Sequence, residues 1–197
     1  MLIDRLLPYA TSVTFAEGAS IYQSHQEVST LYYLKSGRVK IYIDHFNGKR
    51  GVLDFIGPED WLGELSLFRP EMVLKGNTVL TPVQAYAFEL SAIQNLVRED
   101  VAISNGFADY LAQVILKRSY RLSEFMNYPL RNQLARFILM YSDQQYYRIK
   151  HADAAEYLNI SYRHLLYQLQ DFCARGILVK EKGYRIVNRK ALHAFVE

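Results

Sequence analysis

The sequence predicts an α+β protein in which an antiparallel β domain is followed by a long helix and a C-terminal winged helix-turn-helix. Three observations support this fold class. Short β-branched and aromatic runs, separated by glycine and asparagine, continue up to about residue 98. Apolar residues then recur at helical spacing up to Pro129. The remainder contains two short helical segments joined by a tight turn, followed by a pair of short strands.

The β domain is predicted from runs that are typical of short strands: SVTF, ASIYQ, TLYYLKSG, RVKIYIDHFNGKRGVLDFIG, NTVL and VQAYAFEL. In the fourth run, Val39 and Ile41 alternate with Lys40 and Tyr42 at period two. The Asn47-Gly48 pair predicts a hairpin, because both residues tolerate positive φ. Several short strands at this spacing indicate a compact antiparallel barrel or sandwich.

The predicted long helix carries one apolar stripe at heptad-like spacing. Its members are Phe107, Leu111, Val114, Leu122 and Phe125, widened by Tyr110, Ile115 and Met126. A stripe of roughly seven turns is longer than a small barrel can cover. It therefore predicts a homodimer in which two copies of the helix pack together. The alternative is that the β domain of the same chain covers the stripe.

Beyond Pro129, LRNQLARFILMYSD predicts a helix that ends near residues 142–143, and YYRIK predicts a short strand. HADAAEYLNISYRHLLYQLQDFCARG divides into two helices, because Asn159 can end the first in the left-handed conformation and Ser161 can cap the second. Small Ala155 allows the two helices to approach. The buried stripe of the second helix is expected to be Leu165, Leu166, Leu169, Phe172 and Cys173. ILVKEKGYRIV predicts a β wing and RKALHAFV a closing helix.

Charge is divided unevenly along the chain. Residues 1–116 carry 9 Lys/Arg against 13 Asp/Glu, whereas residues 117–197 carry 14 against 7. A basic segment joined to an acidic one is typical of a nucleic-acid-binding module attached to a domain that does not bind nucleic acid. Chance segregation of charge is the alternative.

The composition also excludes several classes of protein. Cys173 is the only cysteine, which rules out an internal disulfide or a multi-cysteine metal site and favours a reducing compartment. The sequence has no secretory leader pattern and no run of 18 apolar residues, so we expect a cytoplasmic protein outside the membrane. We expect no enzymatic activity, because no nucleophile–base pair, metal cluster or glycine-rich phosphate loop stands out.

In this order of elements the chain resembles the CRP/FNR family of bacterial transcription regulators. The resemblance covers nearly the whole chain and rests on GELSLF at 63–68, on Phe15, Gly18, Ile21 and Tyr22, on YYLKSGRVKIY at 32–42, and on the helix-turn-helix with its wing. It implies a β-roll sensor over residues 1–99, a connecting dimerisation helix over 100–128 and a DNA-binding domain over 129–197. It also implies a homodimer that binds palindromic double-stranded DNA, with RNA polymerase as a partner if the protein is an activator rather than a repressor.

The resemblance further implies a ligand pocket. Its residues would be Gly63, Glu64, Leu65, Ser66, Lys75, Gly76, Arg118 and Ser119. In nucleotide-binding members the glycine admits the phosphate and the glutamate binds the ribose. Here Lys75-Gly76 matches an arginine followed by a small residue only if one extra residue is allowed, and lysine lacks the planar fork of arginine. Pro70 disturbs the same loop. We therefore expect GELSLF to close the roll without a cyclic nucleotide, with nucleotide sensing as the alternative.

Other sensing modes of the family fit the residues poorly. An iron-sulfur sensor needs several cysteines. A haem sensor would need an axial histidine near the junction of roll and helix, and residues 46–150 contain no histidine. His25 and His45 are expected in loops or at strand ends, and Cys173 is expected to be a packing thiol. No cofactor is predicted, and the effector stays unidentified.

The resemblance places the DNA contacts on the second helix and the wing: Ser161, Tyr162, Arg163, His164, Tyr167, Gln168, Lys180 and Lys182. Arg163 and Tyr167 stand where the best-known members have a glutamate and an arginine that read bases, so a different operator is expected. The alternative function is a cyclic-nucleotide-binding regulatory or scaffolding module whose C-terminal helices contact protein.

Overall fold

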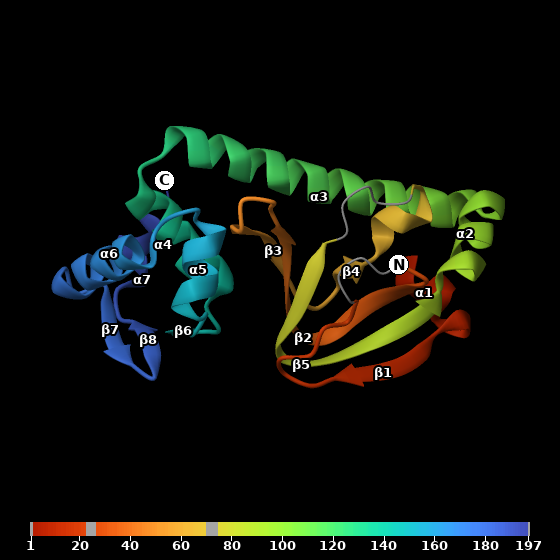
Figure 1. Cartoon of the computed structure of the whole chain (residues 1–197), viewed down its shortest axis with the longest axis horizontal. Helices are drawn as coiled ribbons and strands as arrows, with labels where there is room; N and C mark the ends of the chain where they lie inside the picture. The colour runs from red at the N-terminus through yellow and green to blue at the C-terminus, as the bar shows by residue number, and fades with distance from the viewer. Residues whose placement is uncertain (1, 23–26, 70–74, 197) are drawn as a thin grey trace. The chain divides into compact units, whose positions relative to one another are not determined.

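Figure 1 shows the computed structural model of the chain, which describes residues 2–22, 27–69 and 75–196. The chain forms two compact units, Met1–Ile115 and Leu116–Glu197. The first unit contains the predicted antiparallel β domain, and the second contains the helix-turn-helix with its wing. Helix α3 (Val101–Asn127) contributes to both units and ends just before Pro129, as predicted. None of the described helices is long and apolar enough to cross a membrane.

The β sheet of the N-terminal unit is antiparallel throughout, with the order β1-β5-β2-β3 and with β4 paired to β2. The strands are β1 (Thr11–Phe15), β2 (Thr30–Asp44), β3 (Arg50–Ile56), β4 (Trp61–Leu62) and β5 (Gly76–Glu89). The helical pieces are α1 (Leu2–Leu6), the 3-10 turns η1 (Leu7–Tyr9) and η2 (Glu64–Leu67), and α2 (Leu90–Glu99). Together with α3 they confirm the predicted α+β class.

Strands β2 and β5 continue through positions where the sequence predicted breaks. Their pairing shifts register on both sides of Ser36 and at Arg38, so the strands bulge there without ending. Gly37 has φ +86°, and a Cβ at this residue would lie 2.3 Å from the carbonyl oxygen of Pro82. The glycine and the proline therefore bend two paired strands around each other.

The predicted strand ASIYQ is not a strand over its described residues 19–22. This segment is tied to β5 instead by the amide side chain of Asn77, which is only 1% exposed. The Asn77 Oδ1 accepts a hydrogen bond from the backbone N–H of Ile21 (2.6 Å), and its Nδ2 donates to the carbonyl of Tyr22 (3.2 Å). One buried side chain thus satisfies backbone groups that a neighbouring strand would otherwise satisfy.

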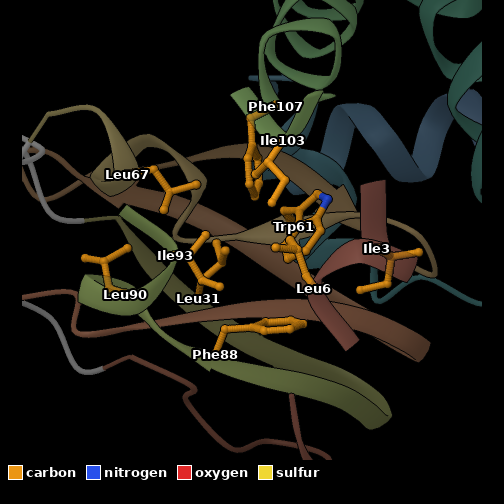
Figure 2. Packing of buried hydrophobic residues seen from close by; sticks show 10 residues of the cluster. All are labelled: Ile3, Leu6, Leu31, Trp61, Leu67, Phe88, Leu90, Ile93, Ile103 and Phe107. Atoms are coloured by element: carbon orange, nitrogen blue, oxygen red, sulfur yellow. The ribbon is translucent and has the colours of Figure 1, made fainter. Parts of the chain in front are cut away.

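The core of the N-terminal unit is centred on Trp61, the single tryptophan of the chain. Figure 2 shows the cluster around its indole ring, to which α1, the sheet, α2 and α3 contribute. The ring centroid of Trp61 lies 4.8 Å from that of Tyr33, 5.6 Å from Phe88 and 5.2 Å from Phe107. The backbone N–H of Trp61 donates to the Tyr110 hydroxyl (3.0 Å), so α3 is held to the sheet by packing and by a hydrogen bond.

The position of Phe107 corrects the predicted dimer stripe. Phe107 is 0% exposed in the core of its own unit, and Leu111 and Val114 are half-buried on the same side of α3. The first part of the stripe therefore packs on the β domain of its own chain, which was the alternative to a dimer contact. Phe125 is half-buried near Tyr157 (ring centroids 6.4 Å), and only Leu122 of the five predicted residues is exposed.

A different face of α3 is exposed along most of its length. It carries Ala108, Ala112, Ile115, Ser119, Leu122 and Met126. These residues alternate four and three apart in sequence, which is the spacing of a coiled-coil seam. Ile115 and Met126, predicted at the edge of the apolar stripe, lie at the centre of this exposed face.

The C-terminal unit has the predicted order of elements, and Figure 1 shows its helices beside a small three-stranded sheet. Its elements are α4 (Leu130–Tyr141), β6 (Tyr146–Tyr147), α5 (His151–Tyr157), α6 (Tyr162–Ala174), β7 (Leu178–Glu181), β8 (Gly183–Ile186) and α7 (Arg189–His193). YYRIK forms only the two-residue strand β6, which pairs with β8. On α6, Leu166 and Cys173 are half-buried, so the fully buried stripe is narrower than predicted.

Phe107→Ala is expected to lower the free energy of unfolding by about 3–5 kcal/mol, because it removes a fully buried ring from the core around Trp61. The measurement is urea unfolding followed by the fluorescence of Trp61. Phe46→Ala is the matched control: Phe46 is fully exposed at the tip of the β2–β3 hairpin, and its loss should change stability by less than about 0.5 kcal/mol. Equal effects of the two substitutions would contradict the assignment of this core.

Candidate DNA-binding surface and effector pocket

The turn between α5 and α6 is built as the sequence predicted. Asn159 has φ +52°, which ends α5 in the left-handed conformation. The Ser161 hydroxyl caps α6 by accepting a hydrogen bond from the backbone N–H of His164 (3.2 Å). Ala155 is buried, and its carbonyl accepts from the N–H of Ile160 (3.0 Å), which fixes the path of the turn. The two helices therefore form a helix-turn-helix.

The first turns of α6 present polar and aromatic side chains to solvent. Most of the predicted DNA contacts of this helix are exposed together: Ser161, Tyr162, Arg163, His164 and Tyr167, with Gln168 half-buried beside them. The opposite side of α6 is fixed by the fully buried Leu165, Leu169 and Phe172. Because the buried side holds the helix against its unit, the exposed side has a defined orientation and could enter a groove of DNA.

The wing consists of β7 and β8, with Lys182 exposed at the turn between them. Gly183 has φ +100°, and a Cβ there would lie 2.7 Å from the carbonyl oxygen of Tyr147, so the close approach of the wing to β6 requires glycine. Lys180 is exposed on β7. Both lysines lie in the same unit as α6, as the predicted phosphate contacts require.

His151, which the sequence analysis did not select, lies against the exposed face of the helix-turn-helix. Its Nδ1 is 3.5 Å from the Tyr162 hydroxyl, and its ring centroid is 5.7 Å from that of Tyr184. Burial lowers the pKa of His151, and the positive charge of Lys180 adds to this effect. Both effects favour the neutral imidazole, which lies next to the Tyr162 side chain. No local pattern marks a histidine at the start of a helix for this role.

Cys173 was expected to be fully buried on α6, but its side chain is only half-buried. Burial raises the pKa of its thiol, and the charge of Lys180 opposes part of that rise. A raised pKa favours the protonated thiol, and the packing role of Cys173 stays a prediction.

In the N-terminal unit, Gly63 begins the predicted ligand-pocket segment with φ +93°. A Cβ at Gly63 would lie 2.4 Å from the Tyr22 hydroxyl and 3.3 Å from the carbonyl oxygen of Thr30. The same Tyr22 hydroxyl donates to the Thr30 carbonyl and lies 3.1 Å from the carbonyl oxygen of Leu62. The fold therefore requires glycine here for its own packing.

The residues after Gly63 form the 3-10 turn η2, which is largely buried. Glu64 is 7% exposed and Ser66 is also buried, with Leu65 half-buried between them. The Ser66 carbonyl accepts a hydrogen bond from the Gln94 side chain (3.0 Å), which joins η2 to α2. This segment closes the end of the sheet.

Gly76, which the resemblance places in the predicted ligand pocket, lies under an aromatic ring. Gly76 is buried at the start of β5 and pairs with Tyr42, and a Cβ at Gly76 would lie 2.3 Å from the Tyr42 ring. The Arg50 guanidinium stacks on the Tyr42 ring, 3.8 Å from its centroid, and forms an ion pair with Asp44 at 2.7 Å. Lys75 is half-buried.

Some residues discussed from the sequence lie outside the described residues or outside the N-terminal unit. Pro70 lies outside the described residues, as does His25. Arg118 and Ser119 lie on α3 in the C-terminal unit, so their part in a pocket stays a prediction. His45 directly follows β2, which confirms its expected place at a strand end.

The interior of the N-terminal unit also holds charged groups that period-two alternation does not predict. Lys40 is 7% exposed because β2 is buried on both faces at this point, and Asp54 is also buried. Burial raises the pKa of Tyr110 well above its usual value, and the carboxylates of Asp60, Glu64 and Asp54 raise it further. Among the residues that the structure describes, no group of three or more His, Cys, Asp or Glu is placed to hold a metal ion.

One known domain family matches the N-terminal unit, and known proteins match larger parts of the chain. The cyclic nucleotide-binding domain family matches residues 12–100. Regulatory protein YeiL of Escherichia coli O157:H7 is 34% identical over 173 residues, which cover 87% of this chain and 79% of that protein. A CRP-like cAMP-activated global transcriptional regulator of Mycobacterium tuberculosis is 26% identical over 127 residues, which cover 64% of this chain and 57% of that protein.

Solved structures show the same fold over nearly the full chain. FixK2 from Bradyrhizobium japonicum superposes with a TM-score of 0.82 at 17% identity, covering 95% of this chain and 98% of that structure. A CRP-family transcriptional regulator from Thermus thermophilus superposes with a TM-score of 0.80 at 21% identity, covering 93% of this chain and 96% of that structure. At these identities the likeness concerns the fold alone.

Proposed function

The chain belongs to the CRP/FNR family of transcription regulators, and we propose that it is a homodimer that binds palindromic double-stranded DNA through α6 and its wing. The observation that carries this proposal is the capped, exposed N-terminal end of α6 in a helix-turn-helix whose opposite side is fully buried. In helix-turn-helix proteins this end of the second helix enters the major groove. Such a regulator would act in the cytoplasm, with RNA polymerase as a partner if it activates transcription.

Charge supports contact with phosphates. Residues 117–197 carry 14 Lys/Arg against 7 Asp/Glu, and Lys180 and Lys182 are exposed on the wing. Lysines at this position would neutralise backbone phosphates without reading sequence. Arg163 lies in the first turn of α6, where its guanidinium could donate two hydrogen bonds to guanine. The surface thus offers both positioning contacts and a base-reading side chain.

The exposed face of α3 supports a dimer. Ile115, Leu122 and Met126 supply apolar surface, while Ala108 and Ala112 are small enough for two helices to approach closely. A twofold axis along this face would present two copies of α6, which would match two half-sites of a palindrome. The proposed seam therefore differs from the predicted stripe and retains only Leu122 from it.

We further propose that the effector is not a cyclic nucleotide. The matched domain family and the cAMP-activated relative favour nucleotide sensing. Against it stand the Tyr42 ring over Gly76 and a lysine in place of a fork-shaped guanidinium. A scaffolding module that binds nucleotides and protein remains the rival function, and it requires no affinity for DNA.

The direct test of the proposed function is selection of DNA from a random pool by the purified protein. Recovery of a palindrome with two equal half-sites would support a twofold-symmetric regulator. Binding without enrichment of any sequence, or no binding even at a low salt concentration of about 50 mM, would count against it.

Dimerisation should depend on the exposed face of α3. The double substitution Ile115→Glu/Leu122→Glu should yield monomers, because each unpaired charge in a buried seam costs about 3–5 kcal/mol. Light scattering reports the mass relative to the 22.9 kDa chain. Val187→Glu replaces an exposed apolar residue away from α3 and should leave the dimer intact. A wild-type protein that is monomeric at micromolar concentration would exclude the seam.

Arg163→Ala and Lys182→Ala should have different effects on operator binding. Loss of a base contact at Arg163 should cost about 1–3 kcal/mol and relax preference at one symmetric pair of positions. Loss of a phosphate contact at Lys182 should weaken binding to all sequences alike and reduce the salt slope by about one per contact. Titrations on the selected operator and its single-base variants at two salt concentrations separate these outcomes. If Arg163→Ala weakens every variant equally, Arg163 is a backbone contact.

Cyclic AMP and cyclic GMP should bind no tighter than roughly millimolar, which corresponds to about 4 kcal/mol of binding free energy. The reason is that the Tyr42 ring lies over Gly76 and that Lys75 lacks the planar fork with which an arginine holds a phosphate. Isothermal calorimetry measures this directly. A micromolar dissociation constant that is lost in Glu64→Ala would refute this part of the proposal.

A further inference from the structure

A groove of about 310 Å³ lies within the C-terminal unit, separate from the exposed face of α6. It is formed by the last turns of α3, by α4 and by the end of α5, the helices labelled in Figure 1. Its apolar lining consists of Tyr120, Phe125, Phe137, Met140, Tyr157 and Leu158. This volume lies within the range of small-molecule sites, which are mostly apolar with a few polar groups.

The groove has a rigid floor and an open rim. Phe137, Tyr157 and Leu158 are buried, and the ring centroids of Phe137 and Tyr157 are 4.8 Å apart. Tyr120 and Met140 are exposed at the rim, Met140 to 47%. Aromatic side chains on the floor and a flexible thioether at the edge favour a flat, apolar ligand.

The charged residues that line the groove favour one sign of charge on the ligand. Three lining residues are cationic, Lys117, Arg121 and Arg136, against one carboxylate, Glu124. Glu124 is already paired with Arg136 at 2.8 Å. The Arg121 guanidinium stacks 4.0 Å from the ring centroid of Tyr157, which holds its charge directly over the aromatic floor. The lining therefore carries a net positive charge and favours an anion.

The groove is separate from the surfaces proposed for dimerisation and for DNA binding. The exposed face of α3 that carries Ile115, Leu122 and Met126 does not line it, and neither do the exposed residues of α6. The groove does include Leu158, the first residue of the turn that leads to α6, and Gln133, whose side chain donates to the carbonyl of Tyr128 at the α3–α4 junction (2.8 Å). A ligand here would touch both the junction and the helix-turn-helix.

We propose that this groove is a binding site for a small aromatic carboxylate, with the ring on the Phe137–Tyr157 floor and the carboxylate toward Arg121 and Lys117. The site is additional to any pocket in the β domain. It can be tested without DNA, so its outcome is independent of the proposed function.

The test is calorimetric titration of the full chain with 2-naphthoate and with its neutral analogue 2-naphthalenemethanol. One naphthoate per chain should bind with a dissociation constant of about 1 mM or tighter, and the alcohol at least about tenfold more weakly. Arg121→Gln should weaken naphthoate by about tenfold, and Met140→Glu should abolish saturable binding by placing a carboxylate at the rim. Val187→Glu, the same kind of substitution outside the groove, should bind as the wild type does.

Three results would overturn the proposal. These are no saturable binding of naphthoate, equal binding of the alcohol, or binding that neither groove substitution alters. Light scattering of Met140→Glu supplies one further check. A changed mass would show that a second copy of the chain covers the groove in place of a small ligand, whereas an unchanged mass agrees with a ligand site. Melting curves by circular dichroism confirm that each variant is folded before it is titrated.

Discussion

The packing of Phe107 on Trp61 is the contact on which the arrangement of α3 depends. The indole ring is also enclosed by Tyr33 and Phe88, and its backbone N–H is bound to Tyr110. Rotation of α3 about its axis would break these contacts together, so the helix has one orientation against the sheet. The neighbouring face with Ile115, Leu122 and Met126 stays exposed as a result, and it offers the residues that a second chain could meet.

The parts of the fold that depend on neighbours in sequence were predictable. The junction of α5 and α6 needs only a residue that tolerates positive φ and a hydroxyl cap, and Asn159 and Ser161 supply both. The end of α3 before Pro129 follows from a single ring that cannot continue a helix. For the same reason the predicted contacts on α6 are found together on one exposed side.

The parts that depend on distant residues were not predictable from local pattern. Gly37 and Pro82 bend two strands around each other, and neither residue alone shows that its strand continues. Asn77 holds a segment more than fifty residues away in sequence. Lys40 follows the alternation of an outward residue, yet β2 is buried on both faces there. The side of α3 that faces inward likewise depends on a distant residue, because Phe107 packs on Trp61.

Gly63 shows how a residue of a ligand-binding motif can be required by the fold itself. A Cβ at this position would collide with the Tyr22 hydroxyl, and φ +93° is strained for any other residue, so the folded domain favours glycine whether or not a phosphate is ever bound. A lineage that abandons its nucleotide would keep the glycine and lose only the residues that touched the ligand. The glycine alone therefore does not identify a ligand, and the chemical identity of any signal must be sought in the side chains around it.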